Sequence, residues 1–154
     1  LHAASRLNLA DLLRGQGREA AVERLLREGL AVTPADGLLH YALGFSLVRQ
    51  VRRDEALLSF REAFALRPAD PRVRHVLAVA LEPSDPRAAL DLLDEGVTAH
   101  PFDIELHWAA AAFHARHGDA EAAHGHAVRM LELAPLDPRP GRLLEQRGKP
   151  SDRQ

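Results

Sequence analysis

Cysteine is absent from the 154-residue chain, so no disulfide, thiolate-bound metal or covalently attached haem can form within this segment. Aromatic residues are scarce as well, at one Trp, one Tyr and five Phe, although 46% of the residues are hydrophobic. A core made mainly of Ala and Leu favours helices that pack closely through small residues over an aromatic-rich sandwich of sheets. The composition therefore predicts an all-α structure.

The charges of the two signs nearly cancel, leaving a formal net charge of −2. This balance argues against a nucleic-acid-binding surface and against broad attraction to anionic membranes. No apolar run approaches the roughly 20 residues of a spanning helix, so we expect no membrane insertion. Lysine occurs once against 19 arginines, a bias that we ascribe to a GC-rich bacterial genome. The composition fits cytoplasm and periplasm equally.

Motifs of catalysis are also missing from the sequence. It contains no glycine-rich phosphate loop after a strand, no Gly-x-Ser-x-Gly elbow and no His-Glu-x-x-His helix. The acidic residues are numerous but scattered along the expected outer faces of helices. We therefore expect a non-enzymatic protein without a cofactor.

A repeated unit organises what is present. Prolines at Pro34, Pro68, Pro101 and Pro135 follow one another at intervals of 34, 33 and 34 residues. A fixed period of this length is typical of stacked helical hairpins. The one shorter interval is explained by the third unit, in which Pro83 must end the preceding helix early.

The same period places small and large apolar residues in columns. A Leu followed by a small residue occurs at Leu9-Ala10, Leu43-Gly44 and Leu77-Ala78, and bulky residues occur later in the unit at Leu26, Phe60 and Leu93. Small residues allow two antiparallel helices to approach, and large residues fill the space between them. In the last unit the sizes are exchanged, with Ala127 in the bulky column and Met130 in a small one, which conserves volume.

This pattern resembles the tetratricopeptide repeat family over roughly residues 3–135. The residues that carry the resemblance are Leu43, Gly44, Ala56, Phe60, Ala63 and Pro68. The resemblance implies a right-handed superhelix of four antiparallel hairpins. To these we add a C-terminal helix near 140–147, which is either a capping helix or the first half of a fifth unit, and a disordered tail over 148–154. The single domain then spans 1–147, with repeats at about 3–36, 37–70, 71–103 and 104–137. The expected helices cover about 3–15 and 18–32, 37–50 and 53–67, 71–82 and 86–99, and 103–117 and 119–133.

The resemblance also implies a binding site, because the first helix of each hairpin lines a concave groove that receives a peptide or a partner's helix. Aromatic residues and arginines dominate interface energetics, and both types occur in the projected groove. Its successive turns contain Leu7, Tyr41, His75 and Trp108; then Asp11, Phe45, Val79 and Ala112; then Arg14, Arg49 and Arg116. These side chains suggest a partner segment that presents acidic groups beside an apolar anchor. Alternatively, Tyr41 and Trp108 pack between repeats, and the arginines are solvated surface charges.

Histidine is unusually frequent, with nine in the chain and five between residues 107 and 126. His114 and His117 lie one helical turn apart, and His124 is expected on the facing helix. Three imidazoles can bind Zn²⁺ or Cu²⁺. Alternatively, His114 is a half-buried packing residue, and His117 interacts with the helix dipole.

The sequence thus predicts a protein–protein interaction module. Three alternatives remain open at this stage. The second unit is similar to C-terminal repeat arrays of bacterial multihaem cytochromes, which would make the chain a regulatory or assembly arm of a larger enzyme. The other two are a histidine-based metal-binding protein and self-association through an exposed end of the array.

Overall fold

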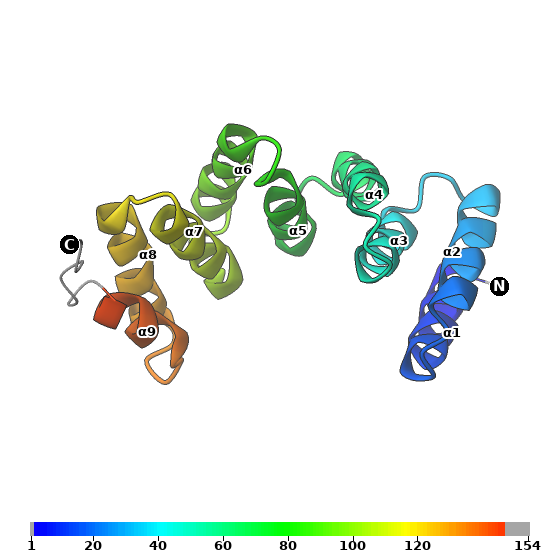
Figure 1. Cartoon of the computed structure of the whole chain (residues 1–154), viewed down its shortest axis with the longest axis horizontal. Coiled ribbons are helices and arrows are strands. Elements are labelled where there is room, and N and C mark those ends of the chain that lie inside the picture. Colours follow the sequence, from blue (N-terminus) through cyan, green and yellow to red (C-terminus); the bar gives the residue numbers. More distant parts are fainter. Residues whose placement is uncertain (1, 147–154) are drawn as a thin grey trace, which may run out of the picture.

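The computed structural model describes residues 2–146, and within these residues the chain forms α-helices and no strand (Figure 1). The disordered tail predicted for 148–154 lies outside the described residues. The helices run in the order α1 (Ala3–Gly15), α2 (Glu19–Val32), α3 (Gly37–Arg49), α4 (Arg53–Leu66), α5 (Pro71–Leu81), α6 (Pro86–Ala99), α7 (Ile104–Arg116), α8 (Ala120–Leu133) and α9 (Arg139–Gln146). No helix in this part of the chain is both long and apolar enough to cross a membrane.

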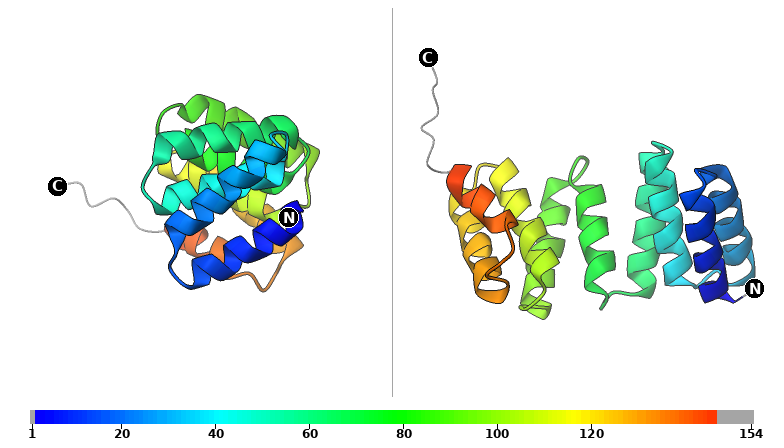
Figure 2. Two further views of the ribbon diagram at one scale, coloured as in Figure 1. Left: turned by 90° about the vertical axis from the view of Figure 1, so that its right-hand side faces the viewer. Right: turned by 90° about the horizontal axis from the view of Figure 1, so that it is seen from below.

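Consecutive helices pair as hairpins, and the hairpins stack side by side into an elongated arch (Figures 1 and 2). The first helices of the hairpins, α1, α3, α5 and α7, lie toward the inner side of the arch in Figure 1, whereas α4 and α6 lie on the outer side. Helix α9 packs against α7 and α8 at the C-terminal end. The predicted all-α solenoid of four hairpins with an additional C-terminal helix is confirmed.

Aspartates fix where most of the helices begin. The Asp36 carboxylate accepts hydrogen bonds from the backbone N–H groups of Leu38 and Leu39, at 3.0 and 3.1 Å. Each such bond satisfies an N–H group that has no partner within its own helix. Four further helices, α5 to α8, begin in the same way after Asp70, Asp85, Asp103 and Asp119.

The turns inside the first, second and fourth hairpins share a left-handed residue. Gly17 and Gly118 adopt φ values of 71° and 83°, and Val51 occupies the equivalent position of the second hairpin with a φ of 62°. A β-branched residue is strained in this conformation because its side chain crowds the backbone. Gly15, in contrast, lies inside α1 and has no positive φ.

Packing within the hairpins matches small residues with large ones. Phe60 of α4 is 2% exposed and lies directly against Gly44 of α3. A Cβ atom added to Gly44 would lie 2.4 Å from Cε1 of Phe60, which is closer than atoms can approach. In the last hairpin Ala127 and Met130 are both fully buried, as the predicted exchange of sizes requires.

Polar contacts connect the first two hairpins. The Glu23 carboxylate accepts hydrogen bonds from Arg27 at 2.8 Å, from Gln50 at 2.9 Å and from Arg52 at 2.7 Å. Burial alone would raise the pKa of Glu23, but these donors outweigh burial and lower the pKa to about 2. Glu23 therefore stays ionised and connects α2 to the turn between α3 and α4.

Candidate partner-binding groove

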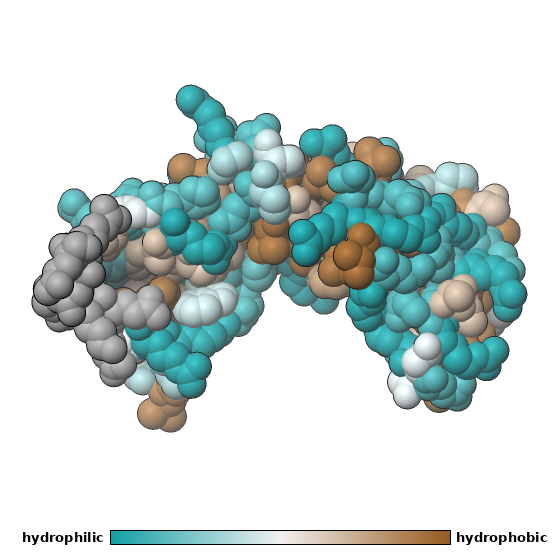
Figure 3. All heavy atoms as spheres, in the orientation of Figure 1, coloured by the Kyte–Doolittle hydropathy of each residue, from teal (hydrophilic) through white to brown (hydrophobic). Residues whose placement is uncertain are grey.

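The inner side of the arch contains a hollow of about 380 Å³ between α1 and α3. Figure 3 shows that the molecule is concave on its lower side, where most of the visible surface is hydrophilic and apolar patches are small. Six of the groove residues predicted from the sequence line this one hollow. The lining consists of Leu7, Asp11 and Arg14 from α1 and of Leu38, Tyr41, Ala42, Phe45 and Arg49 from α3.

An aromatic cluster forms the floor of this hollow. The rings of Tyr41 and Phe45 meet edge to face with centroids 5.0 Å apart, and Phe45 meets Phe60 in the same way at 5.3 Å. Edge-to-face pairs of this kind stabilise the fold by more than the burial of their apolar area alone provides, and they hold the rings in place. Burial raises the pKa of the Tyr41 phenol, which therefore stays uncharged. Tyr41 thus presents a fixed, half-buried ring to the hollow.

The arginines at the rim already have carboxylate partners. Arg49 forms a two-pronged ion pair with Glu19 of α2, with both N–O distances at 3.0 Å, and Arg14 pairs with Asp11 one turn away. Burial would raise the pKa of Glu19, but the Arg49 hydrogen bonds outweigh it and lower the pKa. Nε of Arg14 is buried and has no hydrogen-bond partner among the described residues. The rim is therefore close to neutral, with one donor left over.

The remaining predicted groove residues do not extend the hollow. Val79 is exposed, and Ala112 and His75 are partly buried; burial lowers the pKa of His75. Arg116 forms a two-pronged ion pair with Glu82 of the preceding hairpin, at 2.9 and 2.6 Å. This half of the inner face is therefore tied together by contacts within the protein.

Trp108 is covered by the C-terminal helix. The Arg139 guanidinium at the start of α9 lies 5.5 Å from the centroid of the Trp108 ring and is held there by two hydrogen bonds from Arg139 to Glu105, at 2.9 and 2.8 Å. A cation over an aromatic face is an attractive contact. Tyr41 and Trp108 share a column in the repeat, but they have different surroundings. The sequence analysis did not predict this contact. The sequence feature that could have indicated it is the 34-residue spacing from Glu105 to Arg139, which equals the spacing from Glu82 to Arg116.

The predicted histidine group His114, His117 and His124 does not form among the described residues. His117 turns toward Glu82, with Nε2 3.1 Å from Oε1, and stacks on Phe113 with ring centroids 4.2 Å apart. His124 is exposed on the other side of α8. His114 instead stacks on His126, with ring centroids 5.6 Å apart. Which histidines of α7 and α8 meet depends on which side of α8 faces its neighbours. The spacing of the histidines in the sequence does not reveal that side.

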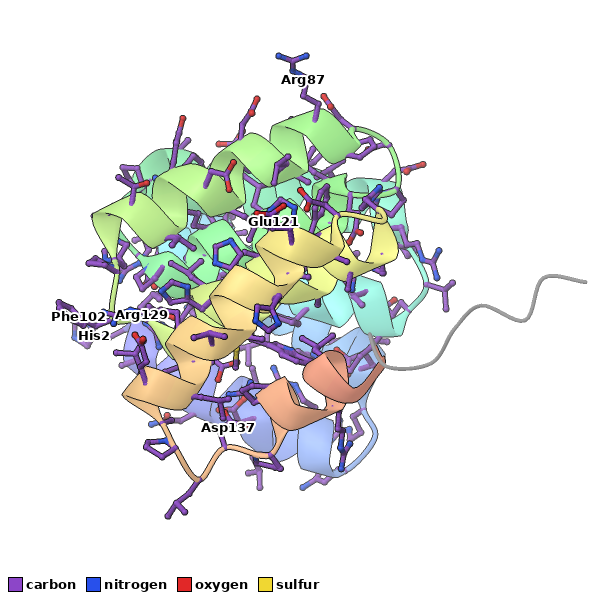
Figure 4. The ribbon with its side chains drawn as sticks, turned by 90° about the vertical axis from the view of Figure 1, so that its left-hand side faces the viewer. His2, Arg87, Phe102, Glu121, Arg129 and Asp137 are labelled. Atoms are coloured by element: carbon purple, nitrogen blue, oxygen red, sulfur yellow. The ribbon has the colours of Figure 1, made fainter. Side chains whose placement is uncertain are left out.

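The C-terminal end of the array retains exposed apolar side chains. Phe102 is exposed and lies beneath the Arg129 guanidinium, which is 5.6 Å from its ring centroid (Figure 4). Leu136, in the segment between α8 and α9, is also exposed. These two apolar side chains lie in the loops before α7 and before α9.

Comparison with known proteins identifies the fold. No family model matches the chain, and no curated protein matches it. Among solved structures, a tetratricopeptide repeat protein from Parabacteroides merdae aligns with a TM-score of 0.81 and 18% identity, covering 94% of this chain and 60% of that one. TTC0263, a TPR protein of Thermus thermophilus, aligns with a TM-score of 0.74 and 21% identity over 94% and 82% of the two chains. YrrB, described as a TPR protein with an unusual peptide-binding site, aligns with a TM-score of 0.71 and 18% identity over 95% and 78%.

The chain therefore has the tetratricopeptide repeat fold, as the sequence resemblance implied. The alternative of an arm of a multihaem cytochrome has no support in these comparisons.

Proposed function

We propose that the chain is a non-catalytic interaction module that binds an apolar side chain of a peptide or partner helix in the hollow between α1 and α3. The observation that carries this proposal is the convergence of six groove residues on one hollow with a fixed aromatic floor. The peptide-binding site named for YrrB supports it by analogy of fold alone.

The chemistry of the hollow favours a particular kind of partner. The floor made by Tyr41 and Phe45 suits an aliphatic or aromatic anchor, which gains free energy by leaving water. The rim arginines Arg14 and Arg49 already pair with Asp11 and Glu19, so any acidic group on the partner competes with these two carboxylates. An apolar anchor therefore fits this hollow better than a strongly acidic segment.

Rigidity of the receptor supports binding. The edge-to-face contacts of Tyr41 and the ion pair between Arg49 and Glu19 hold the lining in place before a partner arrives. Less conformational entropy is then lost by the receptor when the complex forms. A short peptide can therefore bind with useful affinity even though the hollow is small.

The test starts from peptides selected on the purified chain from a random displayed library. Their affinity is compared for the natural chain, for Leu7→Ala and Tyr41→Ala, and for the control Leu58→Ala, which removes an exposed leucine from α4 outside the hollow. Circular dichroism verifies that each variant is folded. We expect the two hollow variants to bind about tenfold or more weakly, corresponding to about 1.4 kcal/mol, and the control to bind normally. Equal affinity for all four chains would refute the proposal.

A further inference from the structure

A second cluster of polar side chains lies away from the groove, where α6 of the third hairpin meets α7 and α8 of the fourth. Asp94, His114 and His126 each offer one ligand atom here, and the three atoms lie within 4.8 Å of one another. The His114 side chain is 11% exposed and Asp94 is exposed, so the cluster has a buried side and an open side. None of these residues takes part in the proposed groove.

Hydrogen bonds fix which nitrogen of His126 carries the proton. Nε2 of His107 lies 3.1 Å from the carbonyl oxygen of Pro101, which can only accept, so His107 donates from Nε2. Nδ1 of a neutral His107 is then an acceptor, and it lies 3.1 Å from Nδ1 of His126. His126 therefore donates from Nδ1, and the lone pair of its ring is on Nε2.

His114 has a carboxylate beside one of its ring nitrogens. Its Nδ1 lies 3.3 Å from Oδ2 of Asp119, so Nε2 is the ring nitrogen left for another partner. A histidine that donates from one nitrogen to a carboxylate, carbonyl or similar acceptor and presents a lone pair from the other is the arrangement found in metal sites.

We propose that His114 and His126, through their Nε2 atoms, and Asp94, through its carboxylate, bind a zinc-class divalent cation that links the third and fourth hairpins. Two imidazoles and one carboxylate suit Zn²⁺, whereas Mg²⁺ and Ca²⁺ prefer oxygen ligands. Three protein ligands leave a fourth position for water.

The distances require only a small closure around the ion. Ligand atoms about 2.0–2.1 Å from a tetrahedral zinc lie roughly 3.4 Å from one another. The Asp94 carboxylate is exposed and forms no ion pair or hydrogen bond with the other described residues, so it can rotate toward the two rings. Because the ligands come from α6, α7 and α8, the bound ion fixes the angle between two hairpins.

Zinc itself is the probe for this site. Tag-free protein is titrated with ZnCl₂ by calorimetry, and its thermal midpoint is recorded with zinc and with a chelator. We expect one zinc per chain and a rise of about 5–10 °C when free zinc exceeds its Kd a hundredfold. The variants Asp94→Asn and His126→Asn should lose most of this rise, whereas the control His124→Asn, on the exposed side of the same helix, should keep it.

Each variant is compared with itself in the two conditions, so a change in its intrinsic stability does not affect the result. Asp94→Asn alters an exposed side chain and preserves the fold. Binding of Co²⁺ gives a second measurement, because a tetrahedral site with nitrogen ligands produces intense visible absorption that an octahedral aqua ion lacks. An absent thermal shift in the natural chain, or an equal shift in Asp94→Asn, His126→Asn and the control, would overturn the proposal.

Discussion

Replacing Gly44 by alanine tests the packing that sets the distance between helices in a hairpin. The added Cβ would lie 2.4, 2.6 and 2.8 Å from three atoms of the Phe60 ring, so the ring must move. It has little room, since Phe60 is 2% exposed and is in edge-to-face contact with Tyr41 and Phe45. Overpacking of this kind costs typically about 1–3 kcal/mol, and the confined ring places Gly44→Ala at the upper end.

Alanine also favours a helix over glycine, by about 1 kcal/mol, which offsets part of the cost. We therefore expect Gly44→Ala to lower the free energy of unfolding by about 2 kcal/mol, equivalent to a fall of about 4–8 °C in the thermal midpoint for a chain of this size. The matched control is Gly125→Ala in α8, where an added Cβ meets nothing within 4 Å. That variant should gain about 0.5–1 kcal/mol, because only the helix propensity changes.

A second substitution identifies the cause. The double variant Gly44→Ala/Phe60→Leu reproduces the Ala–Leu pair found at Ala10 and Leu26 in the first hairpin. We expect it to lie within about 1 kcal/mol of the natural chain, with a favourable coupling of about 2 kcal/mol between the two positions. Urea unfolding monitored by circular dichroism measures the natural chain, the single variants Gly44→Ala, Phe60→Leu and Gly125→Ala, and the double variant. A Gly44→Ala variant as stable as the natural chain would refute the packing argument. So would a double variant that is less stable than the summed effects of the two single variants predict.

Three further predictions concern the backbone, charge and caps. Val51→Gly should raise the free energy of unfolding by about 1 kcal/mol, because glycine adopts the observed φ of 62° without strain. The pKa of Glu23 is lowered to about 2, so the stability that Glu23 contributes is present above its unfolded pKa of 4.5 and is lost as the pH falls toward 2. Glu23→Gln should remove about 1–2 kcal/mol of this acid dependence, after allowance for screening by solvent. Asp36→Ala leaves the N–H groups of Leu38 and Leu39 without their acceptor and should cost about 1 kcal/mol, measured by urea unfolding.

Each of these has a control and a contrary result. Val32→Gly changes an exposed valine at the end of α2 with no positive φ and should bring no gain; a loss of stability in Val51→Gly would contradict the strain argument. Glu28→Gln, an exposed carboxylate on the same helix as Glu23, should leave the pH profile unchanged, and an unaltered profile in Glu23→Gln would exclude the hydrogen-bonded carboxylate as its source. A fully stable Asp36→Ala variant would mean that water replaces the cap.

The order and approximate ends of the helices could be predicted from the sequence because prolines, small residues and helix-starting aspartates recur with one period. Helix α5 ends at Leu81, one residue before the predicted end, and α9 begins at Arg139, one residue before its predicted start. The turn at Val51 was less accessible, since a valine gives no sign of positive φ. Its alignment with Gly17 and Gly118 was the one available signal.

The site was predictable only as far as the repeat register reaches. The register placed Leu7 and Tyr41 in one column, and the structure brings them to one hollow. It did not reveal that Glu19 pairs with Arg49 or that Arg139 covers Trp108, because long side chains can reach several partners and the choice depends on the helix packing. The prediction of the histidine group was limited in the same way, because the sequence does not reveal the rotation of α8 about its axis.

Photocrosslinking tests the proposed groove most directly. A photoreactive phenylalanine analogue is introduced at Tyr41, inside the hollow, or at Leu58, on the outer face of the same hairpin, and each protein is irradiated with the selected peptide. We expect a covalent peptide adduct from position 41 and none from position 58. An adduct from position 58 without one from position 41 would show that the partner binds outside the hollow.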